Sequence, residues 1–190
     1  MKHIFLASDI SIPVATRLAK AQLHLSSEIE KDGGKFRSND VELLNITYKN
    51  FGTIHEERIR LVRDALSEMV KPLFPFEVTI ENIDAFPSLE RASIVWAQLD
   101  ARGRDVIELL QKTVEKEMSA IGFEPEERQF QPQVTLGRVE AMEQQNLSRY
   151  AEDTLKFGRS SVRDIALYSC EQSPSGPVYS VIDRFVLGAI

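Results

Sequence analysis

A mixed fold of helices and antiparallel strands is predicted from three features of the sequence. Three segments repeat apolar residues at the spacing of three and four that is typical of an amphipathic helix, and a fourth, polar segment is predicted to be a weaker helix. About seven short segments are apolar throughout or alternate apolar with polar residues, as strands do. The last two of these strands are separated only by the turn-forming run 173–177, which indicates an antiparallel pair.

Strands and helices are predicted to alternate in the first part of the chain. Residues 3–8 are short and apolar, as in a buried strand. A helix is expected over 13–31, because Pro13 is suited to the first helical turn and Gly33 follows where the apolar spacing stops. Residues 43–51 are predicted to form a strand. The apolar residues of 56–70 are spaced to lie along one face of a helix, which is predicted to end before Pro72 and Pro75.

The middle of the chain is predicted to contain two strands and a helix. Residues 76–83 alternate and lead into Ala85-Phe86-Pro87, and 93–99 are predicted to form the next strand. A third helix is expected over 105–121, and Gly122 is its natural stop.

The last part of the chain is predicted to be mainly strand. Residues 132–139 are predicted to form a strand, and the polar run 143–155 a weaker helix. The antiparallel pair is expected over 162–170 and 178–187.

The net charge of the chain argues against a protein that binds long nucleic acid along its phosphate backbone. The chain has 23 basic and 29 acidic residues among 190, a net charge of −6, whereas proteins that neutralise a phosphate backbone are normally basic. Any nucleic-acid ligand is therefore expected to be short or bound by its end. No apolar run approaches the roughly 20 residues of a membrane span, so no membrane contact is expected. The single cysteine, Cys170, excludes an intrachain disulfide and fits a cytoplasmic location.

Two predicted strands share an unusual polar pattern. Leu44-Asn45-Ile46-Thr47-Tyr48 is echoed 88 residues later by Pro132-Gln133-Val134-Thr135-Leu136, each with an amide two residues before a threonine. Strand alternation places Asn45 and Thr47 on one face, and Gln133 and Thr135 on one face. Two such strands could occur by chance. The residues on either side of them make the match more specific.

The residues around these strands resemble the motifs of the two-histidine phosphoesterases. Asn45-Ile46-Thr47-Tyr48-Lys49-Asn50-Phe51-Gly52 resembles the first motif, His-x-Thr-Leu-x-Phe-Leu-Gly, of the bacterial RNA 2′,3′-cyclic phosphodiesterases, also called 2′-5′ RNA ligases. Arg128-Gln129-Phe130-Gln131-Pro132-Gln133-Val134-Thr135-Leu136-Gly137-Arg138 resembles the second, Arg-x-Phe-x-Pro-His-x-Thr-Leu-x-Arg. The resemblance covers nearly the whole chain. Both threonines are kept, but Asn45 and Gln133 stand where the family has its histidines.

The resemblance implies the fold in more detail than the residue pattern does. It implies an α+β, bilobal fold in which two antiparallel sheets line a central cleft and the helices lie outside. Residues 1–190 are then expected to form a single domain of two pseudo-symmetric lobes, with the two motif strands facing the cleft.

The replaced histidines decide which chemistry is expected. In the family, as the resemblance implies, one histidine deprotonates the attacking water and the other protonates the leaving oxygen. Such work needs a group that changes protonation state near neutral pH. Carboxamides donate and accept hydrogen bonds but do not gain or lose a proton at biological pH. We therefore expect a site that binds phosphate through Asn45, Thr47, Gln133 and Thr135 and is poorly equipped to cleave it.

Four further residues are candidates for the same site. Arg128 and Arg138 match motif positions and are candidate phosphate ligands, with ordinary surface ion pairs as the alternative. Lys49 is predicted to share the strand face of Asn45, with a solvated edge lysine as the alternative. His3 begins the first strand, where a cleft contact competes with a half-buried strand end. The three histidines are scattered and one cysteine does not complete a site, so neither a metal nor a cofactor is expected.

Three functional hypotheses follow. The first is a catalytically degenerate family member that binds a nucleotide or short RNA end bearing a 2′,3′-cyclic or 2′-5′ phosphate. The second is an active RNA 2′,3′-cyclic phosphodiesterase with remodelled catalytic groups. The third is a protein-interaction module whose cleft holds no ligand. The sequence makes no prediction of oligomeric state.

Overall fold

The structure, a computed structural model, describes residues 1–140, 145–152, 155–173 and 176–188. In chain order, the elements are β1 (Lys2–Asp9), α1 (Ile12–Lys31), β2 (Lys35–Ser38), a 3-10 turn η1 (Val41–Leu43), β3 (Asn45–Ile54), α2 (Glu56–Met69), β4 (Phe76–Phe86), a second 3-10 turn η2 (Leu89–Arg91), β5 (Ile94–Leu99), α3 (Ala101–Ala120), β6 (Gln133–Glu140), α4 (Arg149–Glu152), β7 (Lys156–Val162), β8 (Asp164–Ser173) and β9 (Gly176–Val186).

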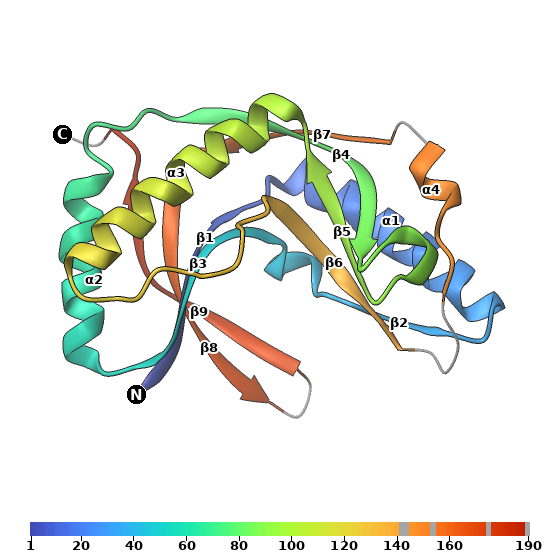
Figure 1. Cartoon of the computed structure of the whole chain (residues 1–190), viewed down its shortest axis with the longest axis horizontal. Coiled ribbons are helices and arrows are strands. Elements are labelled where there is room, and N and C mark those ends of the chain that lie inside the picture. Colours follow the sequence, from blue (N-terminus) through green and yellow to red (C-terminus); the bar gives the residue numbers. More distant parts are fainter. Residues whose placement is uncertain (141–144, 153–154, 174–175, 189–190) are drawn as a thin grey trace.

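Two antiparallel sheets form the framework of the molecule. A four-stranded sheet has the order β3-β1-β8-β9, and a five-stranded sheet has the order β2-β6-β5-β4-β7. Figure 1 shows the two sheets side by side, with β3 of one and β6 of the other at the centre. The predicted α+β fold with two antiparallel sheets is confirmed. The pseudo-twofold relation of the two lobes stays a prediction.

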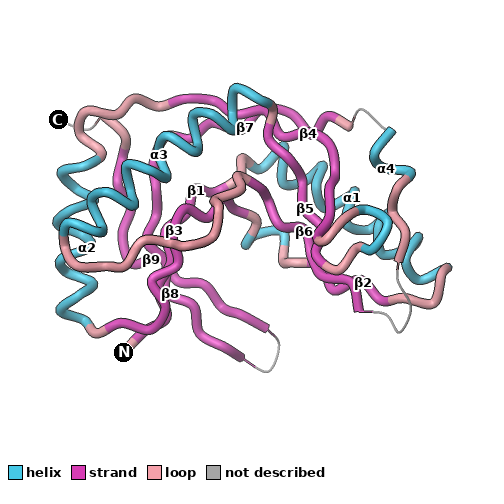
Figure 2. Tube along the Cα trace, in the orientation of Figure 1, coloured by secondary structure: helices cyan, strands magenta, loops and turns pink. Residues whose placement is uncertain are grey.

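Helices α1 and α3 connect the two sheets. Helix α1 follows β1 of the four-stranded sheet but contacts β2, β6 and β7 of the five-stranded sheet. Helix α3 follows β5 and contacts β4 and β5 of the five-stranded sheet as well as α2 and β3 on the side of the four-stranded sheet (Figure 2). One continuous apolar core results, and it includes Leu6 and Ile46 of one sheet together with Ile80 and Val134 of the other.

Some predicted elements differ from the structure. Strands β2 and β7 were not expected, because β2 has only four residues and β7 has only two apolar residues, Phe157 and Val162, among its seven. The helix predicted over 143–155 is described only as the short α4 (Arg149–Glu152); residues 141–144 and 153–154 lie outside the described part. No described helix has the length and apolar composition needed to cross a membrane.

Both motif strands contain an irregularity at the same place. Along β3, Thr47 and Lys49 pair with consecutive residues of β1, so the strand has one residue more than its partner there. Along β6, Thr135 and Gly137 likewise pair with consecutive residues of β5. The extra residues are Tyr48 and Leu136. Such a β-bulge changes which face of the sheet the following side chains occupy, so simple alternation ends directly after each threonine.

Candidate functional site

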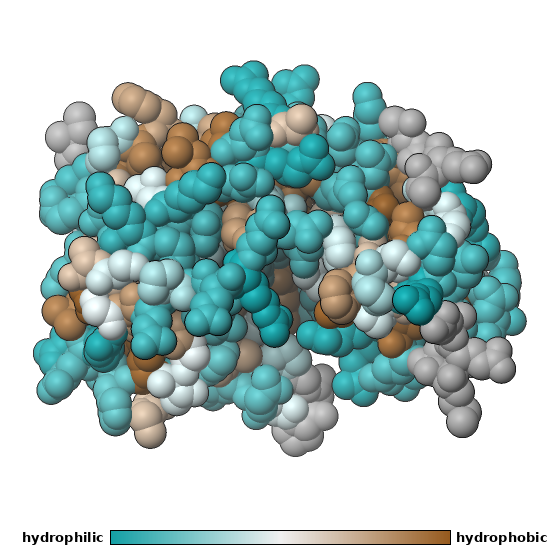
Figure 3. Space-filling model, viewed as in Figure 1, coloured by the Kyte–Doolittle hydropathy of each residue, from teal (hydrophilic) through white to brown (hydrophobic). Residues whose placement is uncertain are grey.

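A pocket of about 800 Å³ lies between the two sheets. Strands β3, β8 and β9 line it from one sheet, β5 and β6 from the other, and the segment 126–131 closes one side. On the face shown in Figure 3 the surface is hollowed between the two halves, and hydrophilic side chains border the hollow. Six of the eight residues predicted from the sequence line this pocket: Asn45, Thr47, Arg128, Gln133, Thr135 and Arg138.

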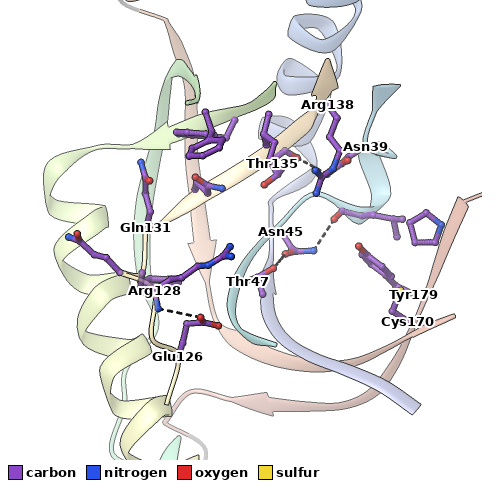
Figure 4. A pocket seen from close by; sticks show the side chains of 18 of the residues that line it. Asn39, Asn45, Thr47, Glu126, Arg128, Gln131, Thr135, Arg138, Cys170 and Tyr179 are labelled. Carbon is purple, nitrogen blue, oxygen red and sulfur yellow. Dashed lines mark hydrogen bonds between the residues drawn. The ribbon is translucent and has the colours of Figure 1, made fainter. Parts of the chain in front are cut away.

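Local hydrogen bonds fix the amide of the first motif strand. The Thr47 hydroxyl donates to Asn45 Oδ1 at 2.8 Å, and Asn45 Nδ2 donates to the Leu43 carbonyl at 2.9 Å (Figure 4). Because a carboxamide has two N–H groups, one donor of Asn45 stays available on the pocket side. The first motif therefore presents a held amide rather than a freely rotating one.

The second motif strand presents two polar side chains with unused hydrogen-bonding capacity. Among the described residues, neither the Gln133 amide nor the Thr135 hydroxyl has a hydrogen-bond partner, while their strand is held from behind. Asn39 Nδ2 donates to the Thr135 carbonyl at 3.0 Å, and Gln22 Nε2 donates to the Leu136 carbonyl at 2.8 Å. The backbone is thus fixed and the two side chains are left to meet a ligand.

Two arginines make the pocket locally positive in an acidic protein. Neither Arg128 nor Arg138 forms an ion pair with any described carboxylate. Glu126 is the only acidic side chain among the lining residues that the structure describes, so the lining has a formal charge of 2 − 1 = +1. Figure 4 shows the guanidinium of Arg128 directed toward Asn45 and Thr47. Such a lining favours an anion.

The prediction that Lys49 shares the pocket face of Asn45 and Thr47 is wrong. The bulge at Tyr48 turns Lys49 to the helix-covered face, where its side chain is 5% exposed. There its Nζ lies 2.7 Å from a carboxylate oxygen of Glu115 on α3. The corresponding bulge in the other strand explains why Arg138 lines the pocket although simple alternation from Thr135 points it away.

His3 does not line the pocket. It lies in β1, half-buried, opposite Thr53 of β3 and Cys170 of β8. Cys170 does line the pocket, so His3 lies on the same sheet face but beyond the lining. None of the three histidines, all of which the structure describes, belongs to the lining residues.

The geometry agrees with what comparison with known proteins finds. Residues 46–173, which include Thr47, Gln133 and Thr135, match the model of the 2′-5′ RNA ligase superfamily. The chain belongs to this superfamily. The chain is 27% identical over 188 residues to an RNA 2′,3′-cyclic phosphodiesterase of Methanothermobacter thermautotrophicus, covering 96% of this chain and 97% of the relative.

Solved structures agree on the fold of this superfamily member. TT0787 of Thermus thermophilus superposes with a TM-score of 0.79 at 21% identity, covering 98% of both chains. Apo LigT of Escherichia coli gives a TM-score of 0.77 at 18% identity, covering 99% of this chain and 98% of LigT. LigT has also been solved in complex with 3′-AMP, with ATP and with phosphate.

Several lining residues were missed by the sequence reasoning because they lie outside the motifs. Asn39 follows β2, and Cys170 and Tyr179 come from the β8–β9 hairpin. Burial raises the pKa of the Cys170 thiol, and burial together with the nearby Cys170 raises the pKa of Tyr179. Both groups are therefore protonated at neutral pH, and they contribute neutral surface rather than a base. No sequence signal placed the hairpin beside the motif strands.

No metal centre is found in the described part of the chain. No group of three or more histidine, cysteine, aspartate or glutamate residues there is placed to hold an ion. The described lining of this pocket offers hydrogen bonding from amides and threonine hydroxyls, with charge from two guanidinium groups and the carboxylate of Glu126.

Proposed function

We propose that this protein is a catalytically degenerate member of its superfamily, which binds a phosphate-bearing nucleotide or RNA end and does not hydrolyse it efficiently. One observation carries the proposal. Asn45 and Gln133, which the family resemblance aligns with the two histidines, both line one pocket. Phosphate binding needs donors and positive charge, which this pocket has, whereas cleavage needs proton exchange, which carboxamides do not provide.

The binding half of the proposal rests on the unpaired donors. Charge-assisted hydrogen bonds from guanidinium groups to phosphate are among the stronger polar contacts in proteins. Arg128 and Arg138 offer such donors, and the Gln133 amide and the Thr135 hydroxyl add uncharged ones. The LigT complexes with 3′-AMP, ATP and phosphate support a nucleotide or RNA end as the class of ligand.

The non-catalytic half rests on the absence of an imidazole from the described lining residues, which leaves Glu126 as their one carboxylate. Among the described lining residues, Cys170 and Tyr179 have raised pKa values and stay protonated near neutral pH. A general acid or base contributes on the order of 10²–10⁴ in rate, so loss of both removes most of the catalytic effect. A cytoplasmic location is part of the proposal and fits the free Cys170.

The test combines binding with turnover on the unmodified protein. Calorimetric titration with adenosine 2′,3′-cyclic monophosphate, 2′-5′-linked diadenylate and inorganic phosphate is expected to give saturable binding below millimolar concentration. Phosphorus NMR of the cyclic nucleotide is expected to show no ring opening above the buffer rate. Arg128→Gln is expected to weaken binding, whereas Arg102→Gln, which changes an exposed arginine of α3 outside the pocket, leaves it unchanged.

A second function is favoured by one specific observation. The relatives aligned over nearly the full chain bear the name RNA 2′,3′-cyclic phosphodiesterase. Rapid ring opening by the pure, unmodified protein would establish this activity and overturn the degenerate assignment. If no nucleotide binds at concentrations up to millimolar, both the binding protein and the active phosphodiesterase are overturned. The hypothesis of a protein-interaction module is then the one that stands.

A further inference from the structure

A buried ammonium lies directly behind the first motif strand. Lys49 Nζ contacts the two carboxylate oxygens of Glu115 at 2.7 and 2.9 Å and the backbone carbonyl of Glu124 at 3.1 Å. The Lys49 side chain is 5% exposed and that of Glu115 16%. An ammonium has three donors, so all three are used and none remains for a ligand. A buried ion pair is by itself weak evidence for stability. The segments of the chain that this pair connects say more about its role.

The contacts of Lys49 connect three parts of the molecule. Lys49 itself is in β3, Glu115 is in α3, and Glu124 begins the segment that leads to the second motif. The residues just before Glu124 are held to the same lobe. Phe123 packs edge to face on Phe51 at 5.0 Å between ring centroids, with the guanidinium of Arg58 4.0 Å from its ring.

Beyond Glu124 the hydrogen-bonded anchoring ends, and Phe130, two residues after Arg128, packs against the core. Among the described residues, no hydrogen bond joins residues 125–132 to the four-stranded sheet or its helices; the Arg128 amide donates only to Glu126 within the segment. Glu124 is therefore the last hydrogen-bonded anchor before Arg128, four residues later. Four residues of extended chain span at most about 14 Å, so the position of the Glu124 carbonyl limits where the Arg128 guanidinium reaches.

We propose that Lys49 is a positioning residue that fixes the segment 124–132 and thereby sets Arg128 against Asn45 and Thr47. The inference deepens the proposed function and rests on it, since Arg128 serves there as an anion ligand. Lys49 fastens the strand two residues after Thr47 and the carbonyl four residues before Arg128. One side chain outside the pocket thus fixes the position of Arg128 relative to the Asn45 and Thr47 side of the anion site.

The test removes the ion pair without leaving a buried charge. The double variant Lys49→Met with Glu115→Met is compared with Lys71→Met with Glu68→Met, which removes an exposed lysine–glutamate pair whose nitrogen–oxygen distance is 2.6 Å. Backbone nitrogen-15 NMR relaxation without ligand is expected to show order parameters for residues 125–131 that fall from about 0.85 to below about 0.6 only in the first variant. If the methionine pair does not fold, Lys49→Gln with Glu115→Gln replaces it.

A double-mutant cycle measures how the Lys49–Glu115 pair affects the contribution of Arg128 to ligand binding. In the unmodified background, Arg128→Gln is expected to weaken the binding of inorganic phosphate or adenosine 2′,3′-cyclic monophosphate about tenfold. In the Lys49→Met, Glu115→Met background, the same change is expected to cost no more than about twofold, because Arg128 is already misplaced. Equal costs in both backgrounds would overturn the proposal, as would unchanged order parameters. If the unmodified protein binds no probe, the proposed function fails, and the relaxation experiment alone decides whether Lys49 holds the segment.

Discussion

Under the proposed function, replacing Asn45 and Gln133 with histidine is expected to give the pocket hydrolytic activity. In Asn45→His with Gln133→His, the geometry at position 45 favours a productive imidazole. Asn45 Nδ2 donates to the Leu43 carbonyl at 2.9 Å, and an imidazole Nδ1–H can make the same contact. The Thr47 hydroxyl, which now donates to Asn45 Oδ1 at 2.8 Å, is released toward the phosphate. The second ring nitrogen then faces the pocket as base or acid.

The size of the effect follows from the two separate proton transfers. Each contributes on the order of 10²–10⁴, and groups that act as a pair are strongly non-additive. We therefore expect either single variant to gain less than about 10²-fold and the double variant to gain about 10⁴-fold. At 1.36 kcal/mol per tenfold change, this is about 5.4 kcal/mol of transition-state stabilisation.

Phosphorus NMR of adenosine 2′,3′-cyclic monophosphate measures the ring opening. The rate of the double variant is expected to be bell-shaped in pH, with both limbs near the ordinary histidine pKa of about 6.5. Ser27→His with Ser119→His adds two exposed histidines on α1 and α3 and is expected to stay inert. A double variant that folds and binds nucleotide but gains nothing would refute the reasoning, as would a parent protein that is equally fast.

Three changes away from the ligand test the framework of the site. Gln22→Leu leaves two backbone carbonyls without the donor that now lies 2.8 Å from each, and urea unfolding should show a loss of about 1–3 kcal/mol. Gly137→Ala places a methyl group 2.5 Å from the Arg37 carbonyl, and a loss of about 1–3 kcal/mol is expected; an unchanged midpoint would contradict this contact. Burial raises the pKa of Tyr48, so its contribution to stability is complete below pH 10, the ordinary pKa, and is lost as pH rises above it. Tyr48→Phe should flatten that alkaline decline.

Strand alternation, which is local, predicted which residues share a face within each motif strand, and the family resemblance implied that the two strands meet at one cleft. Asn45 with Thr47 and Gln133 with Thr135 line one pocket, as alternation within each strand and the family resemblance together implied. The alternation stops being informative directly after each threonine. Lys49 was placed on the wrong face because a bulge depends on how two strands pair, which one strand alone does not reveal.

The remaining lining residues depend on contacts between distant parts of the chain. The β8–β9 hairpin was predicted as a pair of strands, but its place beside β3 follows from the pairing of β8 with β1. Cys170 and Tyr179 reach the pocket only through that pairing. Asn39 reaches it because its amide bonds to the Thr135 carbonyl, 96 residues away. No periodicity in the sequence reports such partners.

The extra residue Tyr48 has a consequence for how the charge of the pocket can change. If Tyr48 paired with Leu6 instead of being the extra residue, plain alternation would place the Lys49 ammonium on the ligand side, without any change of sequence. The electrostatic character of the pocket is thus governed by how two strands pair as well as by composition. A shift of one residue in the pairing is enough to exchange a structural cation for a ligand-facing one.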